Sequence, residues 1–130
     1  MTPEGNTFPK SERLCSRKAI EALFAGGNRA FSAFPLRVVF REVEEPATQI
    51  LVSVSKRHFK HAVDRNRAKR QVREAWRLNR DIIADSPHHY HLAFIWLADE
   101  PQSSEVVHRK VKNLLHRIAE TAIVSKTESC

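Results

Sequence analysis

The stretch AVDRNRAKRQVREAWRLNR, residues 62–80, decides how the rest of the chain must be arranged. On a helix that turns 100° per residue, two kinds of side chain in this stretch separate onto two sides. One side is made by Ala68, Val72, Ala75 and Asn79. The other side, an arc of roughly 100°, is made by Asn66, Lys69, Arg70, Arg73, Arg77 and Arg80. The stretch therefore predicts a helix that packs one face on the protein and presents a row of cations on the other.

The positive charge of the chain is concentrated around this helix. The whole sequence of 130 residues carries a net charge of +7, from 22 Lys and Arg against 15 Asp and Glu. Residues 56–80 alone hold ten of the cations and only two acids, Asp64 and Glu74, so the remainder is close to neutral. Like charges one turn apart on a helix repel each other, at a cost in stability. A bound anion is the simplest reason to keep such a row, and nucleic acid is the commonest anionic partner.

A solvated helix face held by salt bridges is the alternative explanation of the row. Such a face would alternate positive and negative residues, whereas only Glu74 and Asp81 can pair with the cations here. Arginine outnumbers lysine in the segment, and its planar guanidinium matches phosphate oxygens better than an ammonium does. The sequence thus favours nucleic acid over an acidic protein as the partner.

A short helix is predicted near the N-terminus. Ser16 is suited to cap it, and the apolar residues Ala19, Ile20, Leu23 and Phe24 recur at helical spacing. Gly26-Gly27 supplies the left-handed residue that ends the helix.

Two strands are predicted between this helix and the basic segment. From Leu36 apolar and polar residues alternate, with Leu36, Val38 and Phe40 on one face, which is typical of a half-buried strand. Residues 44–46 predict a turn, and residues 50–54 a second strand. We expect the two strands to pair as an antiparallel hairpin.

The C-terminal part predicts one more strand and a long helix. After a break at residues 85–87, the seven apolar residues Leu92 to Ala98 suit a strand that is buried on both faces. A helix from Ser104 to about Val124 carries a broad apolar stripe of Val107, Val111, Leu114, Leu115, Ile118 and Ala122. Its role is to pack against the sheet.

These elements predict an α/β (α+β) sandwich in which helices cover a small mixed sheet of three to four strands, in the order α-β-β-(β)-α-β-α. A length of 130 residues fits a single nucleic-acid-binding domain over 1–130, with flexible ends at 1–12 and 125–130.

The central segment resembles the bacterial ribonuclease P protein family. The resemblance is carried by three runs, the second of which contains the family's Arg-Asn-Arg core: Val54-Ser55-Lys56-Arg57, Ala62-Val63-Asp64-Arg65-Asn66-Arg67-Ala68-Lys69-Arg70 and Arg73-Glu74-Ala75-Trp76-Arg77. Arg13-Leu14, Phe24 with the following glycines, the strands and the closing helix fit the family order over nearly the whole chain. Two departures are Phe59 to Val63, where many members read Gly-Asn-Ala-Val, and Ile20, where many place an aromatic residue.

The resemblance implies the protein subunit of ribonuclease P, which binds the catalytic RNA and the 5′ leader of precursor tRNA and promotes endonucleolytic removal of the leader. The residues that match the family's RNA-binding positions are Lys56, Arg65, Asn66, Arg67, Lys69, Arg70, Arg73 and Arg77. Phe24 matches an aromatic residue of the cleft between the first helix and the sheet, in which the family holds the leader. The family's fold also implies a left-handed crossover through the basic helix.

In this reading the catalytic RNA hydrolyses the phosphodiester bond, with Mg²⁺ bound through the RNA and no cofactor or metal held by the protein alone. No catalytic residue is assigned to the chain. The expected partners are the catalytic RNA and precursor tRNA in the cytoplasm, with no membrane and no obligatory protein partner. A ribosomal or other structural RNA-binding protein, and a stand-alone metal-dependent nuclease, are the alternatives.

Candidate sites for protein-based chemistry are weak. A metal-dependent nuclease needs clustered carboxylates, but Asp64 and Glu74 are nearly three helical turns apart. His88, His89 and His91 are expected in a loop without further ligands. Ser53 and Ser55 are interpreted as strand residues, and Trp76 as a packing residue. Other aromatic residues could stack on unpaired bases, but most aromatic residues at such spacings belong to a core: these are Phe8, Phe31, Phe34, Phe40 and Phe59. After Phe24, only Phe40 and Phe34 are candidates for the leader, and much weaker ones.

The remaining features bear on the compartment. Cys15 and Cys130 could form at most one disulfide, and two reduced thiols are the expectation. The polar residues 1–13 do not resemble a secretory signal, and the longest apolar run is far shorter than a membrane span. We therefore expect a soluble intracellular protein.

Overall fold

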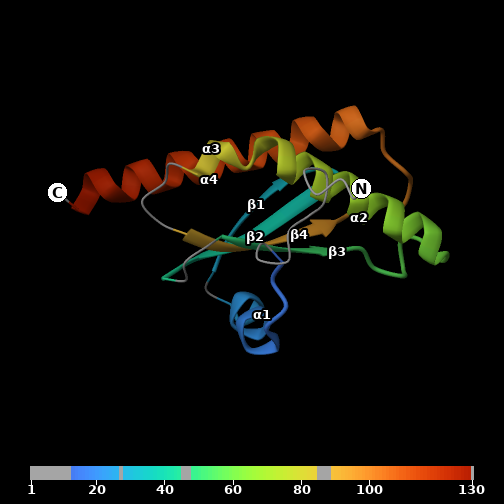
Figure 1. Cartoon of the computed structure of the whole chain (residues 1–130), viewed down its shortest axis with the longest axis horizontal. Helices are drawn as coiled ribbons and strands as arrows, with labels where there is room; N and C mark the ends of the chain where they lie inside the picture. Colours follow the sequence, from blue (N-terminus) through green and yellow to red (C-terminus); the bar gives the residue numbers. More distant parts are fainter. Residues whose placement is uncertain (1–12, 27, 45–47, 85–88, 130) are drawn as a thin grey trace, which may run out of the picture.

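A computed structural model of the chain describes residues 13–26, 28–44, 48–84 and 89–129, with side chains as far as Thr121. The elements are, in chain order, α1 (Arg17–Phe24), β1 (Arg29–Ala33), β2 (Leu36–Val43), β3 (Gln49–Ser53), α2 (Ala62–Asn79), α3 (Asp81–Ala84), β4 (His89–Trp96) and α4 (Ser104–Ser129). Four strands form one mixed sheet, with α1 on one face and α2, α3 and α4 on the other (Figure 1). The predicted sandwich is confirmed, with β1 as the fourth strand and α3 as an additional short helix.

The strands lie in the order β1-β2-β4-β3. β1 and β4 both pair antiparallel with β2, and β3 pairs parallel with β4. The connection from β3 through α2 and α3 to β4 is the crossover that the family resemblance implies. The predicted hairpin between residues 36–41 and 50–54 is wrong, because β4 lies between these two strands. β4 is apolar on both faces, and such a strand is most stable at the centre of a sheet. The strand that forms a hairpin with β2 is β1.

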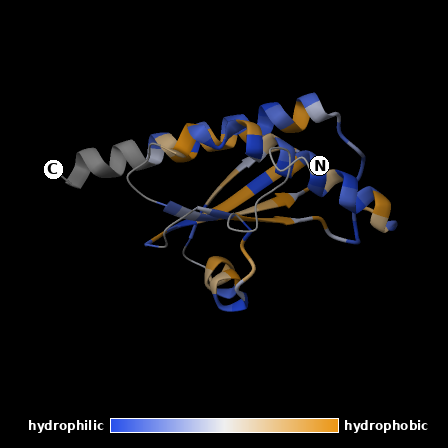
Figure 2. Cartoon of the chain, viewed as in Figure 1, coloured by the Kyte–Doolittle hydropathy of each residue, from blue (hydrophilic) through white to orange (hydrophobic). Residues whose placement is uncertain are grey.

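The main core lies between the sheet and the helices α2 and α4. Tyr90, Leu92, Phe94 and Trp96 point into it from β4, and all four are almost completely buried. The predicted stripe of α4 is confirmed as far as the side chains are described, with Val107, Val111, Leu114, Leu115 and Ile118 fully buried. Figure 2 shows the corresponding alternation of hydrophobic and hydrophilic residues along α4.

A second, smaller core lies under α1 on the opposite face of the sheet. Leu14, Leu23 and Ala93 form it, and Ile20 and Val39 pack against it. β4 is therefore buried on both faces, as its composition predicts. Its first residue is His89, three residues before the predicted start.

Both ends of α1 are fixed as the sequence predicts. The Ser16 hydroxyl accepts a hydrogen bond from the Ala19 amide, at 3.3 Å. Gly26 has φ = +97°, the left-handed conformation that ends the helix. The Asn28 side chain then donates to the carbonyl oxygens of Ala22 and Leu23, at 2.9 and 2.7 Å. The helix is thus closed by side-chain hydrogen bonds at each terminus.

The predictions for the two ends of the chain have different outcomes. α4 continues to Ser129, beyond the predicted end near Val124. Residues 1–12, for which flexibility is expected, lie outside the described residues, as does Cys130, whereas Cys15 is exposed and is a free thiol. In the part of the chain that the structure describes, no helix has the length and apolar character to cross a membrane.

The small core predicts a strong dependence of stability on one side chain of α1. Leu23 is completely buried, so Leu23→Ala should lower the free energy of unfolding by about 2–5 kcal/mol in urea titrations. Leu78→Ala, at a site that is 50% exposed, is the matched control and should stay within about 0.5 kcal/mol of the unchanged protein. Equal effects of the two substitutions would contradict a structural role for the core under α1.

Candidate nucleic-acid interface

The orientation of α2 is set by its apolar side. Ala68, Val72, Ala75, Trp76 and Asn79 are buried against the sheet and α4. Trp76 is 2% exposed, which confirms it as a packing residue. The opposite side of the helix must then face solvent, and Asn66, Arg67, Arg70 and Arg73 are exposed there, with Lys69 half-buried beside them. We call these five residues the basic face.

The Arg65 side chain is hydrogen-bonded to the loop that precedes α2. Its Nη1 atom donates to the carbonyl oxygens of Phe59, at 2.9 Å, and Lys60, at 3.0 Å. His61, the residue that caps α2, makes no side-chain capping hydrogen bond. The Arg65 guanidinium therefore holds the loop that leads into α2, at the place where the sequence departs from the family pattern.

Arg77 is paired with an acid on the same helix. Its Nε and Nη2 atoms donate to the two carboxylate oxygens of Glu74, at 3.1 and 2.7 Å. This hydrogen bond lowers the pKa of the Glu74 carboxyl and raises the pKa of the Arg77 guanidinium. A phosphate approaching Arg77 would compete with Glu74, so Arg77 contributes less to an anion site than the basic face does.

Lys56 lies in an exposed turn between β3 and α2. Ser55 begins this turn, and its hydroxyl accepts from the Arg57 amide at 3.1 Å. The interpretation of Ser55 as a strand residue is therefore wrong, because β3 ends at Ser53. The turn places the Lys56 and Arg57 side chains at the surface ahead of the basic face.

The face of the sheet under α1 carries three rows of side chains. The row covered by α1 is Val39, Ala93 and Leu51. Because side chains alternate between the two faces, two more rows lie on this face, each two residues away along every strand. On one side of α1 the row is Arg41, His91 and Gln49, and on the other side it is Arg37, Ile95 and Ser53. We call the last of these the Arg37 row.

A groove of about 530 Å³ runs between α1 and the row that contains His91. Ala22 lines this groove, whereas Leu23 is buried against the sheet. Successive residues of a helix are 100° apart, so Phe24 must lie on the opposite side of α1 from Ala22, toward the Arg37 row. Phe24 is 47% exposed, so its ring has accessible surface on this side of α1.

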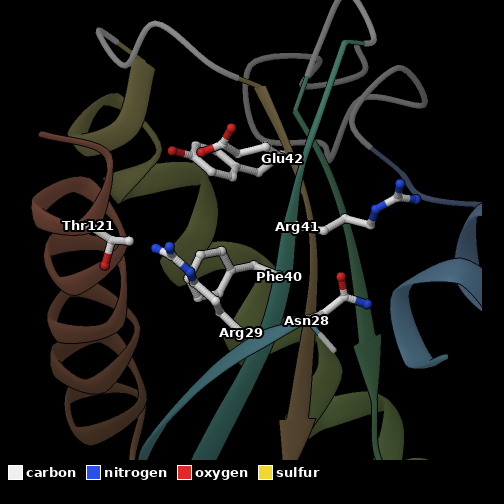
Figure 3. Close-up of a pocket in the computed structure, with 7 residues that line it drawn as sticks. Asn28, Arg29, Phe40, Arg41, Glu42 and Thr121 are labelled. Carbon is white, nitrogen blue, oxygen red and sulfur yellow. The ribbon is translucent and has the colours of Figure 1, made fainter. Parts of the chain in front are cut away.

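Phe40 does not lie on this face of the sheet. It is 3% exposed and packs in the main core, with ring centroids 5.4 Å from Phe31 and 6.1 Å from Tyr90. Its ring therefore has almost no surface on which a base could stack, which argues against the leader-binding role expected for Phe40. A shallow cavity of about 320 Å³ lies over it beside α4, where Arg29 points toward α4 and Arg41 points away toward α1 (Figure 3).

The residues considered for protein-based chemistry are not brought together. His89 and His91 lie in β4 and not in a loop, and His88 lies outside the described residues. Asp64 and Glu74 are separated by ten residues of α2. Within the described ranges, no three His, Cys, Asp or Glu side chains gather as they would around a metal ion.

For the basic residue Arg13 the sequence predicts no binding role, and Arg13-Leu14 only fits the order of motifs in the family. The Arg13 backbone forms a parallel bridge with Ile50 at the outer edge of β3, and the Leu14 amide donates to the Ile50 carbonyl at 2.8 Å. Burial, and in addition the charge of Arg13, lowers the pKa of Arg73 on α2. The charge of Arg13 therefore acts on one residue of the basic face. The available sequence signal was the apolar residue Leu14 directly after Arg13, since neighbouring residues of an extended segment point to opposite sides.

Comparisons with known proteins agree with one another. A family model described as Ribonuclease P matches residues 8–119. Among similar proteins, a ribonuclease P protein component of Porphyromonas gingivalis is 42% identical over 117 residues, covering 85% of each chain, and one of Chlorobaculum tepidum is 30% identical, covering 87% of this chain and 83% of the other. A solved structure of the RNase P protein from Thermotoga maritima superposes with a TM-score of 0.69 at 26% identity, covering 82% of this chain and 96% of the other.

The bonds of Arg65 give a prediction that separates it from its neighbours in sequence. Arg65→Ala removes the two hydrogen bonds to the loop carbonyls and should lower the free energy of unfolding by about 1–3 kcal/mol. Arg70→Ala, on the exposed side of the same helix, should change it by less than about 0.5 kcal/mol. Urea unfolding of both variants is the measurement, and indistinguishable midpoints would show that Arg65 does not hold the loop.

Proposed function

Because this chain belongs to the ribonuclease P protein family, we propose that it is the protein subunit of ribonuclease P, which binds the catalytic RNA and the 5′ leader of precursor tRNA. The basic face of α2 is the observation that carries the proposal. Its apolar side is buried, and its cations point to solvent with Glu74 as the one acid among residues 65–80. Such a surface can neutralise the negatively charged phosphates of RNA.

We assign binding of the catalytic RNA to the basic face together with Lys56. The guanidinium groups of Arg67, Arg70 and Arg73 can each donate two parallel hydrogen bonds to phosphate oxygens. Asn66 lies among them and can both donate to and accept from a sugar or a base edge. Arg65 contributes by fixing the start of the helix, and Arg77 contributes weakly because Glu74 holds it.

We assign the leader to the surface that Phe24 and the Arg37 row share on the face of the sheet under α1. A single-stranded RNA needs aromatic surface for its bases and cations for its backbone. Phe24 supplies exposed aromatic surface, and the Arg37 row on the same face of the sheet contains the exposed cation Arg37 and the half-buried apolar residue Ile95. Ile20 stands where many family members have another aromatic residue, so Phe24 carries the stacking in this chain.

The chemical step belongs to the RNA in this proposal. Mg²⁺ would be held by RNA phosphates, and the described residues of the chain form no carboxylate cluster for it. What the chain does is bind and orient: the basic face holds the catalytic RNA, and the surface of Phe24 and the Arg37 row on the far side of the sheet holds the leader. We place this activity in the cytoplasm, with precursor tRNA as substrate and no obligatory protein partner.

Precursor-tRNA cleavage tests this assignment against a purely structural RNA-binding protein and a stand-alone nuclease. The chain alone should not cleave, and adding it to the ribonuclease P RNA of the same organism should accelerate 5′-leader removal. Replacing Arg67 and Arg70 with Ala should flatten the salt dependence of RNA binding by about 1.4 to 1.8 log units per log unit of salt, because each lost phosphate contact contributes about 0.7 to 0.9.

Arg109→Ala is the matched control, since Arg109 is an exposed arginine on α4 and does not belong to the basic face. It should leave both the rate and the salt slope unchanged. Cleavage by the chain without RNA would establish a nuclease instead, and RNA binding without any acceleration of cleavage would establish a structural role.

The leader surface predicts a different effect for Phe24→Ala. Loss of one stacked base weakens binding by about 1–3 kcal/mol, roughly five- to hundredfold. The assembled enzyme should lose this affinity for precursor tRNA with a leader and keep its affinity for mature tRNA. Thermal unfolding must be measured in parallel: a destabilised variant with normal leader discrimination would make Phe24 a packing residue and overturn its role in leader binding.

A further inference from the structure

The turn that connects β3 to α2 is anchored in the main core at both ends. Val54, before the turn, is 8% exposed. Phe59, after it, is 7% exposed, and its ring centroid lies 6.1 Å from that of Trp96. The amides of His58 and Phe59 both donate to the Ser55 carbonyl oxygen, at 3.1 and 3.4 Å. The backbone between the two core residues is therefore a closed turn.

A side-chain hydrogen bond joins this turn to a second segment. The Nδ1 atom of His58 lies 2.6 Å from the Oδ1 atom of Asp99, which is 41 residues away in the chain. An ionised carboxylate can only accept, so the imidazole donates this bond from a protonated Nδ1 atom. The His58 side chain is 11% exposed and that of Asp99 is 80% exposed. A carboxylate at the surface therefore holds an imidazole that is nearly buried.

Asp99 lies on a loop that is itself anchored. Ala98, directly before it, is 2% exposed and belongs to the main core. After it, the Gln102 carbonyl and the Ser104 hydroxyl accept hydrogen bonds from the Gln71 side chain of α2, at 2.9 and 3.2 Å. The hydrogen bond to the turn therefore comes from a segment that is fixed on both sides.

The turn carries three exposed cations, Lys56, Arg57 and Lys60. Within the described ranges, no salt bridge involves any of the three. The turn leads directly into α2, so these cations continue the positive charge of the basic face beyond the start of that helix. Ordering a flexible segment on binding costs free energy, and this cost is smaller when the backbone is already fixed. The closed turn is thus suited to present its cations to an anion.

We propose that Lys56, Arg57 and Lys60 form one phosphate-binding turn for the catalytic RNA, and that His58 and Asp99 are the positioning residues that hold it. The inference rests on the proposed function, because it requires that the chain binds RNA phosphates through its cations. Lys56 is already assigned to the catalytic RNA, and the proposal adds Arg57 and Lys60 to it. The pair of His58 and Asp99 explains why the three cations keep one arrangement.

Replacement of Asp99 separates positioning from simple electrostatics. Asp99 is an acid near cations, so charge alone predicts that Asp99→Ala strengthens RNA binding. Positioning predicts the opposite: binding of the full chain to the catalytic RNA should weaken by about two- to tenfold, because the turn must then be ordered on binding. The salt dependence should stay the same, since no cation is lost.

Three further variants make this measurement specific. Asp99→Asn removes the same charge as Asp99→Ala but keeps an oxygen that can accept from His58, so it should recover part of the loss. Glu100→Ala, at the next exposed acid, is the matched control and should not weaken binding. Arg57→Ala should flatten the salt dependence by about 0.7 to 0.9 log units per log unit of salt, because it removes a phosphate contact.

Hydrogen exchange of the free protein gives a readout that does not depend on RNA. The amides of His58 and Phe59 are hydrogen-bonded in the turn, so Asp99→Ala should accelerate their exchange. The amides of Val111 and Leu114 in α4 should keep their exchange rates, since both residues are fully buried in the main core. Asp99 itself is largely exposed, so its truncation should leave the fold and the thermal unfolding temperature intact.

Three results would overturn the turn as a site. Asp99→Ala could bind the catalytic RNA as tightly as Glu100→Ala does, or Arg57→Ala could leave the salt dependence unchanged. Weaker binding of precursor tRNA alone, measured with the assembled enzyme, would contradict the assignment to the catalytic RNA. In each case the variant with Arg67 and Arg70 replaced keeps the outcome interpretable: if it still flattens the salt dependence, the proposed function survives and only the turn fails.

Discussion

Burial of the apolar side of α2 is the constraint on which the RNA-binding surface depends. Val72 is completely buried and Trp76 nearly so, and together they fix the rotation of the helix about its axis. The repulsion among the cations on the other side works against folding, at a few tenths of a kcal/mol per pair, whereas burial of a large apolar side chain contributes about 1.5–3 kcal/mol. The core thus holds an array of charges that would not gather on its own. The sheet and α4 can be understood as the support for one charged face.

Periodicity along the chain was sufficient to predict individual elements. The capped helix ending at Gly26, the basic helix, the strand from Leu36 and the striped C-terminal helix all have the predicted character. Pairing was not predictable in the same way, because which strands become neighbours depends on how faces are buried in the whole molecule. The hairpin was predicted because β2 and β3 are close in sequence, but the strand beside β2 on that side is β4. Phe40 shares its parity with Leu36 and Val38, so the pattern that predicted the strand already pointed to its burial.

The candidate site shows a similar division. Charge and spacing predicted the basic face, but sequence cannot distinguish a cation that is available to RNA from one that bonds to its own chain. Arg65 and Arg77 match the family positions and yet donate to the loop carbonyls and to Glu74. Arg13 is 60 residues from Arg73 in the chain, yet its backbone bridges to β3 and its charge contributes to the lowered pKa of Arg73. Contacts of that range follow from tertiary structure alone.

The central position of β4 also determines when the protein can fold during its own synthesis. β2 and β3 both take β4 as a partner, but residues 89–96 leave the ribosome after both strands and after all of α2. Until then β3 has no strand beside it except the Arg13 bridge, and the apolar side of α2 has no completed sheet to cover. Such dependence on contacts between distant segments slows folding. The growing chain therefore exposes its cluster of arginines, attached to an apolar helix face that is not yet buried, before the structure that orients these arginines exists.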